Sequence, residues 1–274
     1  MVNGYAPKTL TEALEIRASQ DVVPYAGGTD LMVQNKAGAS YLFLNKLDEL
    51  RHITDDGEYI RIGASVTFTE GLESDLVPQI MKEAVSRIAS PAIRNAGTFG
   101  GNIGNASDKA DSVLVEFAMD ALVRLVSRDG ERIIPVEEFF VKRGATTLHS
   151  DELIAEILLP KSKCSVPYYY TKVGGRNALA ISRVVAAGVY KINDGVVTAF
   201  SAAFIAGGGV FQRFKDIEAT IIGKTPEEIK NNIDEYVKAY SENLVFGRGR
   251  VSAEYRTAVT LNLIRDYLGT IAEK

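Results

Sequence analysis

The chain contains the run Arg94-Asn95-Ala96-Gly97-Thr98-Phe99-Gly100-Gly101-Asn102-Ile103, in which three of ten residues are glycine. An earlier run, Tyr25-Ala26-Gly27-Gly28-Thr29-Asp30-Leu31, places two adjacent glycines between a short apolar segment and a helical pattern. Because glycine has no Cβ atom, such runs let a bulky anion approach the backbone N–H groups closely. A helix that begins directly after the run adds positive potential. Two runs of this kind favour a site for the two phosphates of one dinucleotide.

A purely structural reading competes with this one, because a Gly-Gly pair in a loop is often only a turn. Neither run has the spacing Gly-x-Gly-x-x-Gly of a Rossmann domain, and neither has the Gly-x-x-x-x-Gly-Lys-Ser/Thr of a P-loop. The side chains beside the glycines favour a ligand, since they offer hydroxyl, amide and carboxylate groups. These residues are Thr29, Asp30, Thr98 and Asn102. The residues alone therefore leave a dinucleotide site and simple turns as two open readings.

Hydrophobic periodicity predicts an N-terminal part in which helices and strands alternate, and a C-terminal part with strands first and helices after. Strands are predicted at 22–25, 41–44, 59–63, 121–126, 132–134, 153–159, 168–173, 181–192 and 196–205. Helices are predicted at 10–18, 78–89, 112–119 and 253–268, with capping boxes at 67–70 and 225–228, and 95–105 is predicted to be a loop. We expect one domain over 1–165, with lobes of about 1–54 and 55–165, and a second domain over 166–274.

The composition excludes several classes of function. With 31 basic and 35 acidic residues the net charge is −4, which argues against nucleic-acid and anionic-membrane binding. Cys164 is the single cysteine, and His52 and His149 are the only histidines, so we expect no iron–sulfur cluster and no transition-metal site on this chain. No stretch is apolar and long enough to cross a membrane, and no export signal is evident. We expect a cytoplasmic protein whose redox carrier, if it has one, is organic.

The two runs resemble the pyrophosphate loops of the FAD-binding subunits of molybdenum hydroxylases, a family that includes xanthine, carbon monoxide and nicotinate dehydrogenases. Residues 26–31 are similar to the family's Ala-Gly-Gly-Thr-Asp-Leu, and residues 94–103 to its Arg-Asn-x-Gly-Thr-x-Gly-Gly-Asn-Ile. The resemblance continues in order along essentially the whole chain. It implies an α+β fold with a two-lobed FAD-binding domain and a C-terminal domain that combines an antiparallel sheet with helices.

The resemblance also implies the residues that bind the cofactor. Backbone N–H groups of both runs would hold the FAD pyrophosphate and ribityl chain. The residues concerned are Ala26, Gly27, Gly28, Thr29, Asp30 and Leu31 in the first run, and Thr98, Gly100, Gly101 and Asn102 in the second.

Three further positions match family residues near the flavin. Asp111 would accept a hydrogen bond from the cofactor, Ile154 would pack on the flavin, and Lys172 would stabilise the reduced flavin electrostatically. Other readings stay open: Ile154 as a core residue, Lys172 as a solvated lysine at a strand end, and Asp111 as the N-cap of the following helix. Apart from Lys172 no side chain is expected to act in catalysis, and no residue is expected to bind a metal.

Two other features add to the expected site. Asp108 stands where the family has a proline, which adds charge to the loop beside the flavin. The cluster Tyr168-Tyr169-Tyr170 has two readings: a ring that covers the flavin, or aromatic residues that favour a β-strand. Since neither histidine lies in a glycine run, we expect FAD to be held non-covalently.

The implied function is electron transfer within a larger complex. Electrons would pass from a molybdopterin centre on a large partner subunit, through iron–sulfur clusters on a small partner subunit, to FAD on this chain. They would then leave to NAD(P)+ or another acceptor. The alternatives are a free-standing FAD-dependent reductase of the same fold and a scaffolding subunit without flavin. The sequence specifies neither the substrate of the complex nor its stoichiometry.

Overall fold

The computed structural model describes residues 4–34, 38–176, 179–206, 209–247, 249 and 251–274. The chain opens with a three-stranded parallel sheet of order β1-β3-β2, whose strands are β1 (Gly4–Tyr5), β2 (Val23–Tyr25) and β3 (Tyr41–Phe43). Helices α1 (Leu10–Ser19) and α2 (Leu31–Gln34) connect these strands. Helix α1 begins where the sequence predicts it because the Thr9 hydroxyl accepts a hydrogen bond from the Glu12 N–H.

The second lobe is built on a five-stranded antiparallel sheet of order β4-β5-β10-β6-β7. The strands are β4 (Ile53–Asp55), β5 (Tyr59–Gly63), β6 (Leu122–Ser127), β7 (Gly130–Pro135) and β10 (Leu153–Pro160). Strand β10 is buried on both faces at the centre of the sheet, which explains its nearly uninterrupted apolar sequence. The remaining elements of this lobe are α3 (Phe68–Glu73), α4 (Gln79–Ser86), α5 (Pro91–Arg94), α6 (Phe99–Gly104), α7 (Asp111–Ala118), α8 (Val136–Phe139), β8 (Phe140–Lys142) and β9 (Ala145–Thr146).

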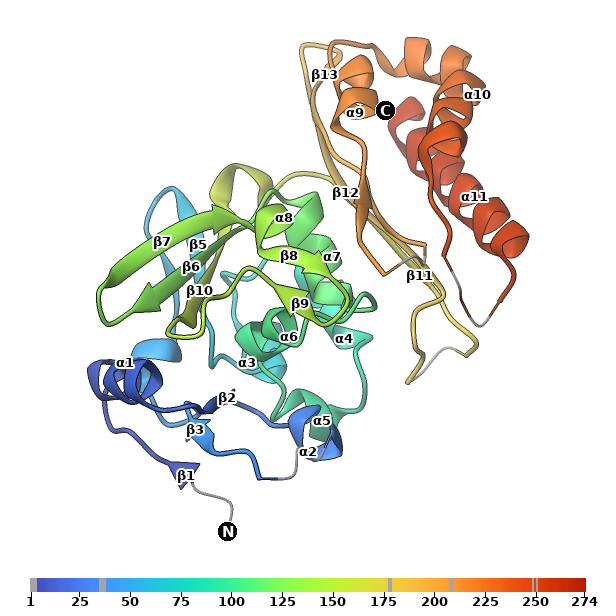
Figure 1. Cartoon of the computed structure of the whole chain (residues 1–274). Helices are drawn as coiled ribbons and strands as arrows, with labels where there is room; N and C mark the ends of the chain where they lie inside the picture. The colour runs from blue at the N-terminus through green and yellow to red at the C-terminus, as the bar shows by residue number, and fades with distance from the viewer. Residues whose placement is uncertain (1–3, 35–37, 177–178, 207–208, 248, 250) are drawn as a thin grey trace.

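The C-terminal part is a sheet followed by helices, as predicted. Its strands are β11 (Tyr168–Val173), β12 (Val184–Asn193), β13 (Val196–Phe200), β14 (Ala203–Ile205) and β15 (Gln212–Arg213), all paired antiparallel. Helices α9 (Lys215–Ile221), α10 (Pro226–Asn243) and α11 (Ala253–Ala272) complete it. In Figure 1 these helices stand apart from the N-terminal sheets, with β11 and β12 between the two parts of the molecule. The predicted α+β fold is confirmed.

The structure differs from the sequence prediction at three informative places. The stretch predicted as a loop contains helix α6, whose N-cap Thr98 accepts a hydrogen bond from the Gly101 N–H at 3.0 Å. Helix α7 begins at Asp111, and its N-cap is Ala110, which makes no side-chain cap. Strand β4 begins before residue 54 and pairs with β5, so it belongs to the second lobe. The gap between β10 and β11 supports a division near residue 165, and we propose domains of 1–165 and 166–274.

Helix α7 joins the two parts of the molecule. All eight of its residues are buried, and it packs against α4 on one side and against β12 and β14 on the other. It therefore contacts both the N-terminal lobe and the C-terminal sheet. Among the described residues, no helix is both long and apolar enough to cross a membrane.

Candidate functional site

The structure brings the two glycine-rich runs into contact. Gly27 lies so close to the second run that a Cβ atom on it would stand 1.8 Å from the Ala96 carbonyl oxygen. A carboxylate oxygen of Asp30 accepts a hydrogen bond from the Asn105 side-chain amide at 2.8 Å. Gln34 donates a further hydrogen bond to Asn105 at 3.2 Å. Two segments that are distant in the sequence therefore form one continuous surface.

The first run presents a row of unbonded backbone donors. Residues 26–30 form the turn between β2 and α2, and Gly28 has a positive φ of 67° that glycine adopts without strain. Within the described part of the chain, none of the N–H groups of residues 26–30 donates to another backbone group. The carbonyls of Gly28 and Asp30, in contrast, accept bonds from Met32 and Gln34 at 2.9 Å. N–H groups left free in this way attract an anion.

The second run uses most of its donors within the protein. The N–H groups of Phe99 and Gly100 donate to the carbonyls of Val66 and Ala64 at 3.1 and 3.0 Å. Those of Gly101 and Asn102 donate to the hydroxyl and the carbonyl of Thr98. The N–H groups of Gly100, Gly101 and Asn102 are therefore occupied within the protein, whereas that of Thr98 donates to no backbone group among the described residues. What the run offers instead is backbone surface without side chains, because Gly101 and Gly104 are exposed on α6.

Ile154 lies beside this surface. Its Cδ1 atom would be 3.1 Å from a Cβ atom placed on Gly104, and its side chain is 9% exposed. It also belongs to the largest hydrophobic core of the molecule. The structure thus places Ile154 both in the core and beside the surface formed by the exposed glycines of α6.

Asp111 and Lys172 form a buried ion pair between the two parts of the molecule. The Lys172 Nζ atom lies 2.6 Å from Asp111 Oδ2, and the two side chains are 6% and 5% exposed. The Ser182 hydroxyl donates to Asp111 Oδ1 at 2.6 Å, and Lys172 also donates to the Arg87 carbonyl at 3.0 Å. Burial raises the pKa of Asp111, and the charge of Lys172 and its hydrogen bond oppose that rise. Neither the solvated reading of Lys172 nor the N-cap reading of Asp111 agrees with this geometry.

Three other predicted residues have clear positions in the structure. The Asn102 amide donates to the Ser112 hydroxyl at 2.9 Å, which ties the second run to α7. Asp108 is buried and lies 3.7 Å from the Arg143 guanidinium. Tyr169 stacks on Tyr267 in the C-terminal core, with ring centroids 4.9 Å apart, which supports the packing reading of the tyrosine cluster.

Sequence reasoning assigned no role to Ser182, although it lies in a run, Ile181-Ser182-Arg183, that resembles the family. Its contact with Asp111 joins residues 71 positions apart, and no local pattern signals such a pair.

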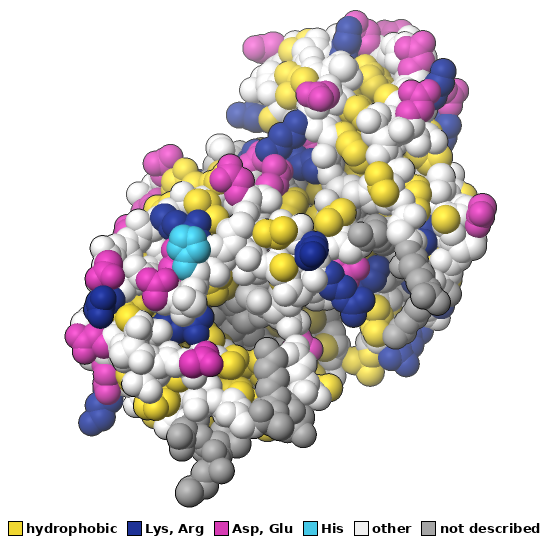
Figure 2. Space-filling model, viewed as in Figure 1, with side chains coloured by type: hydrophobic (Ala, Val, Ile, Leu, Met, Phe, Trp, Pro, Cys, Tyr) yellow, Lys and Arg dark blue, Asp and Glu magenta, His cyan; other side chains and the backbone are white. Residues whose placement is uncertain are grey.

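The face of the molecule shown in Figure 2 carries both positively and negatively charged side chains. Lysine and arginine side chains are interspersed with acidic ones over this face. Among the described residues, no group of three or more histidine, cysteine or acidic side chains is arranged to hold a metal ion. The positive features of the site include backbone N–H groups, the buried Lys172, and Arg87, whose charge also acts on Asp111.

The fold and this arrangement of donors define the class of protein, an α+β chain that holds a phosphate-bearing cofactor. Residues 1–162 match the family described as the FAD binding domain in molybdopterin dehydrogenase. Residues 169–271 match the CO dehydrogenase flavoprotein C-terminal domain. The chain therefore belongs to the FAD-binding flavoproteins of the molybdopterin dehydrogenase family, and its cofactor is FAD.

Individual relatives agree with this assignment. The chain is 31% identical over 235 residues to the nicotinate dehydrogenase FAD-subunit of Eubacterium barkeri, covering 80% of this chain and 79% of that one. It is 33% identical over 207 residues to the xanthine dehydrogenase FAD-binding subunit of Escherichia coli O157:H7, covering 72% and 70%. A chain of the reconstituted CO dehydrogenase from Oligotropha carboxidovorans has the same fold, with a TM-score of 0.90 at 22% identity over 100% of this chain and 98% of that one.

Proposed function

We propose that residues 26–30 bind the FAD pyrophosphate through their backbone N–H groups. The observation that carries this proposal is the row of donors without a partner in the described chain, next to a surface of exposed glycines. A negatively charged diphosphate accepts hydrogen bonds from such a row without any lysine or arginine. Gly101 and Gly104 would let the cofactor lie against α6. The binding is non-covalent, since neither run contains a histidine or cysteine.

The buried pair of Asp111 and Lys172 supports a role beside the flavin ring. When bound, FAD supplies the electron-transfer chemistry, and the protein supplies position and electrostatics. The ammonium group of Lys172 would favour the negative charge that the ring system gains on reduction. Asp111 and the Arg87 carbonyl fix the Lys172 side chain, so that it does not have to reorganise when that charge appears. Ile154 would limit the access of water on one side.

We further propose that the chain is the flavoprotein subunit of a multisubunit molybdenum hydroxylase. The names of its relatives, as FAD-subunits and medium chains of nicotinate and carbon monoxide dehydrogenases, support this. Molybdopterin and iron–sulfur clusters would lie on a large and a small partner subunit, and electrons would leave the FAD to NAD(P)+ or another acceptor. A cytoplasmic location is part of the proposal, and the half-buried Cys164, whose pKa burial raises to about 11, would remain an unreactive thiol there.

The first experiment is an FAD titration of the full-length chain. We expect saturable binding with the visible absorption of an oxidised flavin. Lys172→Met should weaken the binding and lower the reduction potential of the bound flavin. The matched control is Lys161→Met, which removes a half-exposed lysine paired with Asp55 and should change neither property. A chain that stays colourless in excess FAD would contradict the flavin assignment.

The second experiment addresses the partners. The native complex should be purified through a tag on this chain and analysed for metals before and after the subunits are separated. We expect molybdenum and iron in the complex and neither metal on this chain. If the chain alone oxidises NAD(P)H and reduces a small substrate at a useful rate, the free-standing reductase is the better description.

A further inference from the structure

The C-terminal domain holds the carboxyl end of helix α7. The Arg213 guanidinium donates to the Phe117 carbonyl at 2.6 Å, and the Ser201 hydroxyl donates to the Ala118 carbonyl at 2.6 Å. These are two of the last carbonyls of the helix, and that of Phe117 also accepts a backbone bond from the Asp120 N–H at 3.3 Å. Arg213 belongs to strand β15 and Ser201 lies between β13 and β14, while α7 belongs to the N-terminal domain. The end of the helix is therefore fixed by residues of the other domain.

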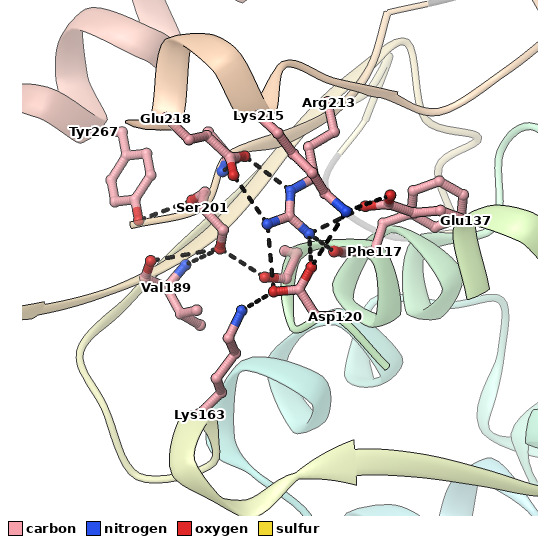
Figure 3. A network of polar contacts seen from close by, with 12 residues as sticks. Phe117, Asp120, Glu137, Lys163, Val189, Ser201, Arg213, Lys215, Glu218 and Tyr267 are labelled. Carbon is pink, nitrogen blue, oxygen red and sulfur yellow. Dashed lines mark hydrogen bonds and ion pairs between the residues drawn. The ribbon is translucent and has the colours of Figure 1, made fainter. Parts of the chain in front are cut away.

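Arg213 is the centre of this contact, as Figure 3 shows. Its side chain is 7% exposed and forms a two-pronged ion pair with Glu218, at 2.8 and 2.9 Å. The same guanidinium bonds to Asp120, two residues beyond the end of α7, and to Glu137 at 3.2 Å. Asp120 has a positive φ of 54°, an uncommon conformation for a residue other than glycine. The ion pairs with Arg213 and Lys163 hold it there.

The charges in this network balance. Three cations face three carboxylates, namely Arg213, Lys163 and Lys215 against Asp120, Glu137 and Glu218. No charge is left over for a ligand, so the network serves to join the domains rather than to bind an ion. Because a buried arginine loses its hydration, it is stabilising only when all of its donors are satisfied, as they are here.

The other end of α7 carries Asp111, which contacts Lys172 and Ser182 of the C-terminal domain. A helix of eight residues is about 12 Å long and behaves as a rigid rod over that length. Any movement of its carboxyl end against the C-terminal sheet therefore changes the position of Asp111 relative to Lys172. The C-terminal domain therefore contacts both ends of helix α7.

We propose that Arg213 is a positioning residue for the flavin site. It holds the carboxyl end of α7 and thereby keeps the Asp111–Lys172 pair in register across the two domains. This inference rests on the proposed function, because it assumes that the pair lies beside FAD. Through α7, the C-terminal domain would thus influence the reduction potential of the flavin.

The test uses the full-length chain and the variant Arg213→Gln. We expect the variant to bind FAD about tenfold more weakly and to show a lower flavin reduction potential. Ser201→Ala, which removes a single hydroxyl group, should lower the FAD affinity and the reduction potential by smaller amounts. This variant replaces Arg213→Gln in the test if Arg213→Gln does not fold. The matched control is Arg265→Gln, which breaks an exposed ion pair with Asp234 on the helices of the C-terminal domain.

A double-mutant cycle with Lys172→Met separates positioning from stability. If Arg213 acts through the pair, its effect on the reduction potential disappears in the Lys172→Met background. If the two effects simply add, Arg213 only stabilises the fold and the inference is wrong. It is also wrong if Arg213→Gln binds FAD with unchanged affinity and potential. Failure of the unaltered chain to bind FAD would instead refute the proposed function itself.

Discussion

The two glycine-rich runs are similar in sequence, but their backbone N–H groups have different roles in the structure. The first run, residues 26–31, leaves the backbone N–H groups of residues 26–30 without partners in the described chain. The second run, residues 94–103, uses most groups of this kind to build and anchor helix α6. Glycine therefore serves two purposes here: it exposes donors in one run, and in the other it permits close packing of backbone against backbone.

The difference arises because the two runs have different neighbours in space. The first run crosses from strand β2 to the single-turn helix α2, and the neighbouring described elements offer no carbonyl to its donors. The second run passes the loop after β5, where the carbonyls of Ala64 and Val66 accept its bonds. Gly100 is required at that crossing, since a Cβ atom on it would stand 2.5 Å from the Ala64 Cβ.

The largest expected effect is that of Gly27→Ala, at the contact between the runs. Its methyl group would stand 1.8 Å from a backbone oxygen, so the first run must move. We expect a loss of about 3 kcal/mol in the free energy of unfolding and no measurable FAD binding at micromolar concentrations. Chemical denaturation and flavin titration measure the two effects.

The comparison variant is Gly100→Ala in the second run, where the added methyl group would also be too close to its neighbours. It should lose stability while the folded fraction still binds FAD. Wild-type affinity in Gly27→Ala would show that the first run is not the site of the pyrophosphate.

A smaller effect is expected on the pH dependence of stability, through Glu116 on helix α7. The second run is bonded to this helix through Asn102 and Ser112. The Glu116 carboxyl group is fully buried and has no hydrogen-bond partner in the described structure, and burial raises its pKa to about 8. The unfolded chain releases this proton near the ordinary pKa of 4.5, whereas the folded chain keeps it until about 8. Stability therefore falls as the pH rises between these values, by about 2 kcal/mol from pH 5.5 to pH 7.

Glu116→Gln should abolish this dependence, since it keeps the shape and removes the titration. Denaturant unfolding of both proteins at several pH values is the measurement. Parallel pH profiles for the two proteins would mean that Glu116 is already ionised in the fold.

The smallest effect is expected for Gly101→Ala in the second run. The added methyl group would crowd the cofactor and would stand 2.8 Å from the Thr98 hydroxyl, which caps α6. We expect a loss of about 1 kcal/mol in stability and a roughly threefold weaker binding of FAD. Gly269→Ala, in helix α11 with no atom near the new methyl group, is the control. Unchanged FAD affinity in Gly101→Ala would remove the second run from the binding site.

Much of the fold was predictable because the relevant signals are local. The capping boxes at Thr67 and Thr225 begin helices α3 and α10 as predicted, with both reciprocal hydrogen bonds present. Strand β11 has the predicted bounds, since three consecutive tyrosines followed by β-branched residues favour a strand. Helix α6 was missed because three glycines argue against a helix, whereas the Thr98 cap and the burial of Phe99 and Ile103 stabilise it.

The sequence by itself indicated the cofactor, because its two glycine runs resemble the FAD loops of a known family. Composition and spacing alone left a dinucleotide site and simple turns open. Tertiary structure alone decided which run keeps its donors free, which depends on whether a carbonyl from a distant segment is within reach. It also decided the contacts of Asp111 with Lys172 and of Arg213 with α7. Such pairs join residues that are far apart in the chain, and only the packing of two domains around one helix brings their charges together.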